Sequence, residues 1–151
     1  GFLQIWLAAD ARHSTARQLT MRGYPGKVRC LDWHPVDPLI ATAGGPDVVL
    51  WDLPAKGQQA RGRPLRHHAR PVTALCWSHG GQLLASADRD GLVCVWDRMG
   101  AAVFSRSTGH EISTLAWHPD DAMLAAGDTG GRILLMQCLC ADDAEGAPAT
   151  S

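Results

Sequence analysis

Residues 67–97 read "HHARPVTALCWSHGGQLLASADRDGLVCVWD", and this stretch decides the fold. It consists of short apolar runs rich in Val, Leu and Trp, and the cluster "SHGG" interrupts them. Apolar runs of four to six residues between turn-forming clusters are typical of β-strands. The chain shows no long helical periodicity. The stretch therefore predicts several short antiparallel strands.

The same pattern occurs three times in the chain. It is found as "CLDWHPVDPLIATAG" (30–44), "ALCWSHGGQLLASAD" (74–88) and "TLAWHPDDAMLAAGD" (114–128). The tryptophans of this series lie 44 and 40 residues apart, at Trp33, Trp77 and Trp117. A second series ends a strand every 45, 45 and 40 residues, at Trp6, Trp51, Trp96 and, in degenerate form, Met136. All six tryptophans belong to one series or the other, which indicates an internal repeat.

With this period and these motifs, the sequence resembles the WD-repeat family of β-propellers over roughly residues 1–137. The resemblance implies an all-β fold, a partial β-propeller of about three and a half four-stranded antiparallel blades. We expect the second half of a blade in 1–22 and whole blades in 23–66 and 67–107. A last, degenerate blade is expected in 108–140, and a flexible tail in 141–151.

The resemblance also implies a hydrogen-bonded tetrad in the best-matching unit. Carried over by position, its members are His68, Ser86, Asp90 and Trp96. Ser, His and Asp could also indicate a hydrolase triad, but Ser86 lies inside a predicted strand and no G-x-S-x-G motif occurs. We therefore predict a structural network in which Asp90 turns inward, and no catalytic residue.

The neighbouring units depart from this pattern. In the first, Tyr24 stands in place of the histidine, Thr42 keeps the hydroxyl, and Asp47 does not align securely. In the last unit the serine, aspartate and tryptophan are replaced by Ala126, Gly130 and Met136. A network that is intact in one unit of three fits a stabilising role better than a mechanism.

Composition narrows the function further. The formal net charge of −1 predicts no general attraction to nucleic acid or membranes, and no apolar run is long enough to span a bilayer. The five cysteines form no C-x-x-C pair, so the sequence indicates neither a disulfide scaffold nor zinc, and we expect a cytoplasmic protein. His67, His68, Cys76 and His79 should face apart, so we predict neither a metal nor another cofactor.

These observations favour a non-catalytic scaffold that mediates protein–protein interactions. In the family, partners commonly dock on the loops before the first strand and between the second and third. Here these loops contain three basic residues, Lys27, Arg70 and Arg89, and, apart from Asp90 of the tetrad, a single acid, Glu111. We therefore predict an acidic peptide or protein surface as the partner.

The alternative is a nucleic-acid or ribonucleoprotein adaptor that uses residues 55–70, which hold five basic residues and no acid. Such a short charge run more often keeps an exposed edge solvated, which is the interpretation we favour.

A final expectation concerns completeness. Gly1 falls where Gly91 falls in the intact unit, so the chain is expected to begin within a blade and to be the C-terminal part of a longer propeller. The missing blades are then a further partner.

Overall fold

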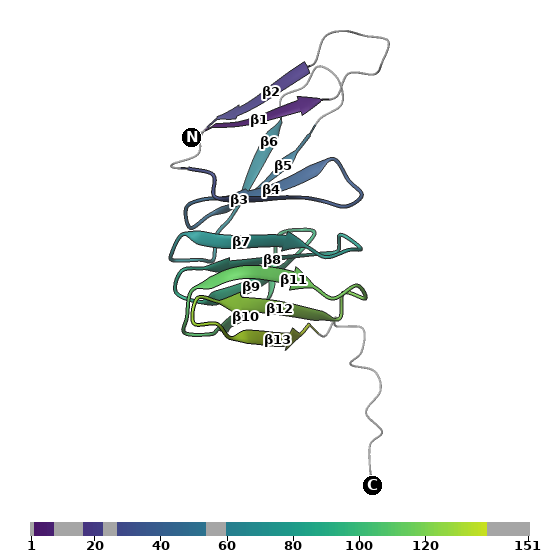
Figure 1. Cartoon of the computed structure of the whole chain (residues 1–151). Helices are drawn as coiled ribbons and strands as arrows, with labels where there is room; N and C mark the ends of the chain where they lie inside the picture. Colours follow the sequence, from purple (N-terminus) through teal and green to yellow (C-terminus); the bar gives the residue numbers. More distant parts are fainter. Residues whose placement is uncertain (1, 8–16, 23–26, 54–59, 139–151) are drawn as a thin grey trace.

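The computed structural model describes residues 2–7, 17–22, 27–53 and 60–138, and these form strands joined by turns and loops (Figure 1). The elements are β1 (Phe2–Leu7), β2 (Arg17–Arg22), β3 (Cys30–Trp33), β4 (Leu39–Ala43), β5 (Val48–Asp52), β6 (Arg61–Leu65), β7 (Val72–Trp77), β8 (Leu83–Asp88), β9 (Leu92–Asp97), β10 (Ala102–Ser107), β11 (Ile112–Trp117), β12 (Met123–Asp128) and β13 (Ile133–Gln137). No helix long and apolar enough to cross a membrane occurs in these ranges.

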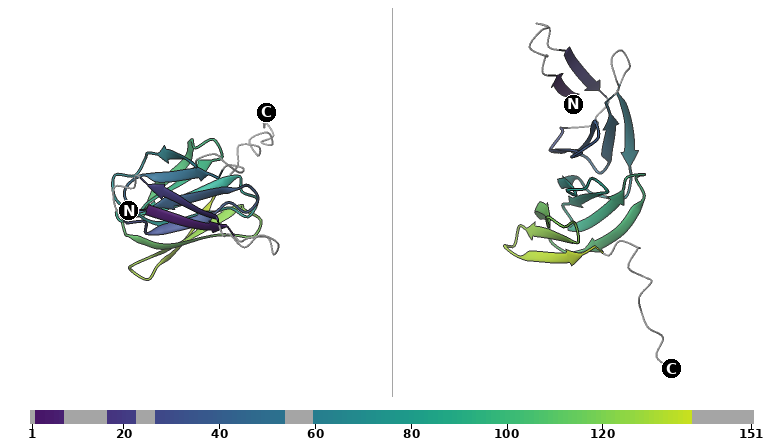
Figure 2. Two further views of the ribbon diagram at one scale, coloured as in Figure 1. Left: turned by 90° about the horizontal axis from the view of Figure 1, so that it is seen from above. Right: turned by 90° about the vertical axis from the view of Figure 1, so that its right-hand side faces the viewer.

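The strands form four antiparallel sheets in sequence order. β1 pairs with β2, two four-stranded sheets hold β3–β6 and β7–β10, and β11–β13 form a three-stranded sheet. The right-hand view of Figure 2 shows the sheets following one another along a curve. The all-β fold, that of a partial propeller, is confirmed. The Tyr24 and 141–151 predictions lie outside the described residues.

Alternation along the strands explains why the sheets stack. In β8 and β9 the odd-numbered residues Ala85, Ala87, Val93 and Val95 pack against β11–β13, whereas the even-numbered Leu84, Cys94 and Trp96 pack toward β4 and β5. Successive side chains of a strand point to opposite faces, so a sheet that is apolar on both faces is buried between two neighbours. The small residues of β8 let the sheets approach closely.

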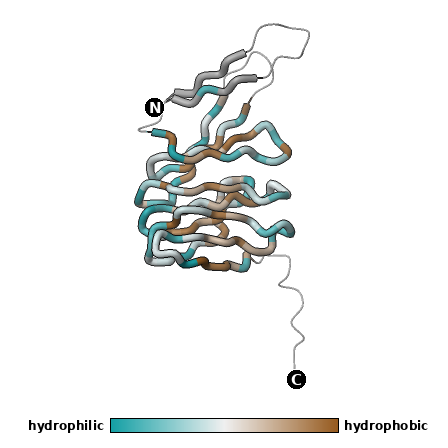
Figure 3. The backbone as a smooth tube through the Cα atoms, viewed as in Figure 1, coloured by the Kyte–Doolittle hydropathy of each residue, from teal (hydrophilic) through white to brown (hydrophobic). Residues whose placement is uncertain are grey.

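Strand β13, at the C-terminal end of the stack, shows the same alternation of apolar residues, but no other sheet of the described residues packs against its outer face. Ile133 and Leu135 of β13 hold the positions of Val93 and Val95, but they are 77% and 69% exposed whereas the two valines are buried. Figure 3 shows the hydrophobic colour of this strand. No other described residue covers this apolar face.

Polar contacts at the β3–β4, β7–β8 and β11–β12 turns also join neighbouring sheets. Nε2 of the buried His34 donates to the carbonyl of Gly81 at 2.8 Å, and its ring packs edge-on against Trp77. One sheet further along, Asp121 accepts from the backbone N–H groups of His79 and Gly80 at 2.7 Å each. These contacts hold together the end of the sheets that carries the β3–β4, β7–β8 and β11–β12 turns.

Candidate functional site

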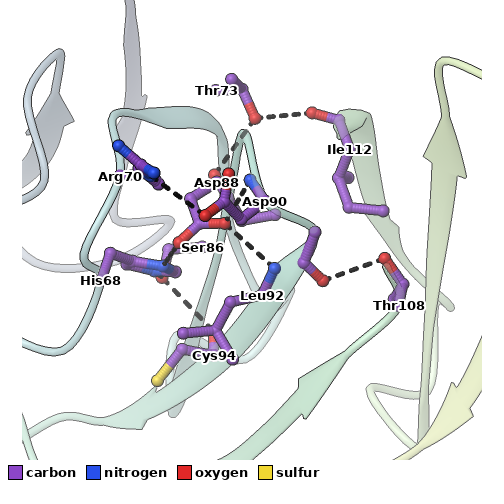
Figure 4. A network of polar contacts seen from close by, with 12 residues as sticks. His68, Arg70, Thr73, Ser86, Asp88, Asp90, Leu92, Cys94, Thr108 and Ile112 are labelled. Carbon is purple, nitrogen blue, oxygen red and sulfur yellow. Dashed lines mark hydrogen bonds and ion pairs between the residues drawn. The ribbon is translucent and has the colours of Figure 1, made fainter. Parts of the chain in front are cut away.

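A continuous chain of polar groups runs through the β7–β10 sheet, and Figure 4 shows most of its members. Nε1 of Trp96 donates to Oγ of Ser86 at 2.8 Å, and that oxygen lies 2.7 Å from Nε2 of His68. Nδ1 of His68 lies 2.8 Å from Oδ2 of Asp88. A carboxylate can only accept, so Nδ1 carries the imidazole proton and Nε2 accepts from the serine hydroxyl.

The acid of this chain is Asp88, and the prediction of Asp90 was wrong. Asp88 ends β8 two residues after Ser86, so both side chains point to the same face of the strand, toward His68. Asp90 lies beyond the strand in the β8–β9 turn, and its side chain is 64% exposed against 2% for Asp88. Strand alternation from Ser86 is the sequence signal that identifies Asp88.

Asp88 also builds the turn that follows it. Its Oδ1 accepts from the backbone N–H groups of Asp90 and Leu92, both at 3.0 Å, while the N–H of Gly91 donates to its carbonyl at 3.1 Å. An aspartate that caps backbone donors two and four residues ahead stabilises a tight turn. Asp88 therefore connects the imidazole of the core to the loop at the surface.

The serine of this network has no access to solvent. Ser86 is 0% exposed, Asp88 2% and His68 7%. A hydrolase nucleophile needs an open approach for the substrate and oxyanion donors beside it. Here the hydroxyl group is used on one side by the indole N–H and on the other by the imidazole.

Burial also determines the charge of the imidazole. Desolvation lowers the pKa of His68 below its ordinary value of 6.5, although the hydrogen bond and the charge of Asp88 act in the opposite direction. His68 is thus neutral at neutral pH, as the direction of its hydrogen bonds requires.

We expect the free energy of unfolding to decrease as the pH falls below about 6.5. The unfolded chain protonates His68 at its ordinary pKa and the folded chain only at a lower pH. Between these values the unfolded state binds more protons, so acidification favours unfolding until the folded pKa is passed. Urea unfolding at several pH values measures this slope, which a His68→Gln variant should reduce. Equal slopes in the parent and the His68→Gln variant would refute the assignment.

In the neighbouring sheets, other residues make the hydrogen bonds that correspond to those of Ser86 and Asp88. In the β3–β6 sheet, Nε1 of Trp51 donates to Oγ1 of Thr42 at 2.9 Å. In the β11–β13 sheet, Asp128 takes the place of Asp88, and Nε of Arg132 donates to it at 2.7 Å. The hydrogen bond from the backbone N–H of Arg132, together with the hydrogen bond and the charge of its guanidinium, lowers the pKa of Asp128 despite the cost of burial. The sequence comparison placed the lost acid of this sheet at Gly130. The position that corresponds to Asp88 is instead Asp128, which keeps the acid.

The predicted partner residues lie at one end of the sheets, together with the β4–β5, β8–β9 and β12–β13 turns and the loops before β3, β7 and β11. We call this end the turn face. It holds the exposed side chains of Lys27, Arg70 and Arg89. Nε of Arg70 lies 3.0 Å from Oδ2 of Asp90, and Nε of Arg89 lies 3.7 Å from Oε1 of Glu111.

The charge balance of this face differs from the sequence prediction. Asp90 was expected to turn inward, which would have left Glu111 as the lone acid. Instead it points outward and pairs with Arg70. Nearby, Nε of Arg66 lies 3.4 Å from Oδ2 of Asp47. The arginines thus face carboxylates of the chain itself, an arrangement across loops that the sequence did not reveal.

The basic segment 55–70 is only partly described, because residues 54–59 lie outside the described ranges. Arg61 and Arg63 are exposed on the outer strand β6. The guanidinium of Arg63 donates to the carbonyls of Met99 and Arg98, and Arg98 pairs with Asp37. Arg63 therefore joins the outer strand of one sheet to the β9–β10 turn of the next.

The cysteines and histidines of the described ranges form no metal site. Within the described ranges, no group of three or more His, Cys, Asp or Glu side chains could hold a metal ion. Burial raises the pKa of Cys76 to about 12 and that of Cys30 to about 11, so both remain protonated thiols at neutral pH. His79 instead lies against Asp121, with Nδ1 and Oδ1 3.0 Å apart.

The family model described as "WD domain, G-beta repeat" matches residues 16–52, 60–97 and 102–135. These matches cover more than half of the chain, and the protein belongs to the WD-repeat family. The chain is also similar to the solved β-propeller domain of Cps50 (Swd1) from Myceliophteria thermophila. The TM-score is 0.67 at 25% identity, over 78% of this chain and 36% of that one.

Curated relatives include proteins of different assemblies. The U3 small nucleolar RNA-associated protein 15 homolog of Xenopus tropicalis is 40% identical over 94 residues, which are 62% of this chain and 18% of the relative. The anaphase-promoting complex subunit cdc20 of Dictyostelium discoideum is 30% identical over 135 residues, 85% of this chain and 25% of the relative. The chain thus spans a quarter or less of the length of these two proteins.

Proposed function

We infer that the chain is a non-catalytic scaffold module that binds protein partners through its turn face. The observation that carries this proposal is the contrast between the two sets of polar residues in and beside the β7–β10 sheet. The groups that could perform chemistry, Ser86 and His68, are buried and used by each other. The groups on the turn face, Arg70 and Arg89, are exposed and project from different loops.

The relatives support this proposal. Dictyostelium cdc20 is by its name a subunit of a complex, and rigid sheets that present loops to partners suit such a role. Because Cys30, Cys76 and Cys94 form no disulfide, we also propose that the protein works in the reducing cytoplasm. The proposed partner is an acidic protein segment, and a longer propeller would supply further blades over the exposed face of β13.

Nucleic-acid binding is the second candidate, favoured by the U3 small nucleolar RNA-associated relative and by the exposed Arg61. Against it, Arg63 of the same strand is used to contact the neighbouring sheet. The two candidates differ in salt dependence, since phosphate binding weakens steeply with ionic strength.

Reversing both charges in an Arg70→Glu/Arg89→Glu variant tests the proposal. We expect the association rate constant for a labelled decaglutamate peptide to fall several-fold at low salt, and less at high salt, because exposed charges steer association and are screened. Stopped-flow fluorescence with the full chain measures both conditions.

The matched control reverses two exposed arginines on the outer strands, Arg61→Glu/Arg106→Glu. This pair should leave peptide association close to that of the parent. An equal loss in both variants would show that only the overall charge matters. A larger effect of the outer pair on oligouridine binding would favour the nucleic-acid candidate.

A further inference from the structure

The β8–β9 turn places two consecutive charged residues against two different loops. Asp90 points to Arg70 in the loop before β7, and Arg89 points to Glu111 in the loop before β11. Figure 4 shows Arg70 joined to Asp90, close to Asp88, and the exposed fractions place this pair at the surface and Asp88 in the interior. The turn thus stands in the middle of two arginine–carboxylate pairs on the turn face.

Both pairs are built so that they can open. Each joins the carboxylate through Nε, so the terminal nitrogens of the guanidinium remain available to another acceptor. The side chains of Arg70 and Asp90 are 62% and 64% exposed. Exposed pairs of this kind contribute little to stability, because water and salt screen them.

The β11–β13 sheet provides the contrast. Asp128, which pairs with Arg132, is buried at its side chain, and its second oxygen accepts the backbone N–H of Arg132. That pair is part of a turn and has no reason to open. The exchangeable pairs that the β8–β9 turn makes are therefore those of Asp90 with Arg70 and of Arg89 with Glu111.

We propose that Asp90 and Glu111 pair with Arg70 and Arg89 when no partner is bound. The carboxylates of an acidic protein partner then displace Asp90 and Glu111 from the two arginines on binding. This inference rests on the proposed function of the turn face and adds its regulation, namely that the chain masks its own binding site. Exchange of one carboxylate for another keeps each guanidinium paired in both the free and the bound state. Such a face discriminates against ligands that cannot compete with its own acids.

The charge of the face favours a peptide over a nucleic acid. Its exposed basic residues are Lys27, Arg29, Arg66, Arg70, Arg89 and Arg132, and the carboxylates paired with them are Asp47, Asp90, Glu111 and Asp128. Six positive against four negative charges leave an excess of two. Nucleic-acid affinity comes mainly from neutralising many phosphates. A nearly balanced face is better suited to a partner with a few well-placed carboxylates.

The test removes the masking charges without changing the arginines. An Asp90→Asn/Glu111→Gln variant of the full chain should bind the decaglutamate peptide about tenfold more tightly than the parent at low salt. Fluorescence anisotropy measures the dissociation constant. The matched control, Asp37→Asn/Asp120→Asn, makes the same change in net charge on the opposite end, where Asp37 pairs with Arg98 and Asp120 with His118.

The outcomes separate this inference from the proposed function. Tighter binding by the Asp90→Asn/Glu111→Gln variant, here called the unmasked variant, and not by the control supports both the masking and the proposed binding face. If the affinity of the unmasked variant equals that of the parent while Arg70→Glu/Arg89→Glu still weakens binding, masking is wrong and the binding face stands. Equal gains in the unmasked and control variants overturn masking, because net charge then explains the effect. A gain for oligouridine without one for the peptide overturns the acidic-protein assignment.

Discussion

An Asp88→Ala variant is expected to lose about 3 kcal/mol of unfolding free energy, whereas Asp90→Ala should lose less than about 0.5 kcal/mol. The alanine at position 88 leaves the buried imidazole N–H of His68 without its acceptor. It also removes the acceptor of the Asp90 and Leu92 backbone N–H groups. A buried donor without a partner costs about 1–3 kcal/mol, and here several lose theirs together.

Urea unfolding of the full chain, followed by tryptophan fluorescence, measures both variants. The conservative Asp88→Asn variant adds a discriminating test. An asparagine Oδ1 can still accept from the turn N–H groups, and its NH₂ can donate to Nδ1 once His68 adopts the other tautomer. We therefore expect Asp88→Asn to lie between the parent and Asp88→Ala. Losses of equal size at positions 88 and 90 would contradict the observed geometry.

The network was predictable in part from the sequence. The resemblance to the WD-repeat family gave His68, Ser86 and Trp96 by position, and the structure joins them through hydrogen bonds. The acid was misplaced because alignment by position put it in the turn. Two-residue alternation from Ser86 puts it at Asp88, the last residue of the strand. For a buried partner, the periodicity of the strand was the stronger guide.

The surface of the turn face was less predictable. Which carboxylate an exposed arginine meets depends on the directions of loops that come from different strands, and the repeat does not specify them. The pairs of Arg70 with Asp90 and of Arg89 with Glu111 therefore came from the structure. The same holds for Arg63, which reaches carbonyl groups of the next sheet. With Asp90 exposed, the charges of Lys27, Arg70 and Arg89 are opposed by two carboxylates rather than by Glu111 alone.

Gly91 and Gly131 form a matched pair that separates backbone strain from packing. They occupy equivalent turns and have φ angles of +84° and +83°, in the left-handed region that side chains disfavour. A Cβ atom at Gly131 would meet no atom within 4 Å, whereas one at Gly91 would lie 2.4 Å from the carbonyl oxygen of His110 and 2.6 Å from Oγ1 of Thr108. Only Gly91 is closely packed against the loop that leads to the next sheet.

We therefore expect Gly131→Ala to cost about 1 kcal/mol, for backbone strain alone, and Gly91→Ala about 2–4 kcal/mol. The additional loss arises because His110 O belongs to the backbone and cannot rotate away. The loop must shift instead, which disturbs the hydrogen bonds of Thr108 to the carbonyls of Gly91 and His110. Because Glu111 follows directly, its pairing with Arg89 should change as well. Urea unfolding of the two variants side by side measures the difference. Equal losses would mean that the loop adapts freely and that its contact with Gly91 adds nothing to stability.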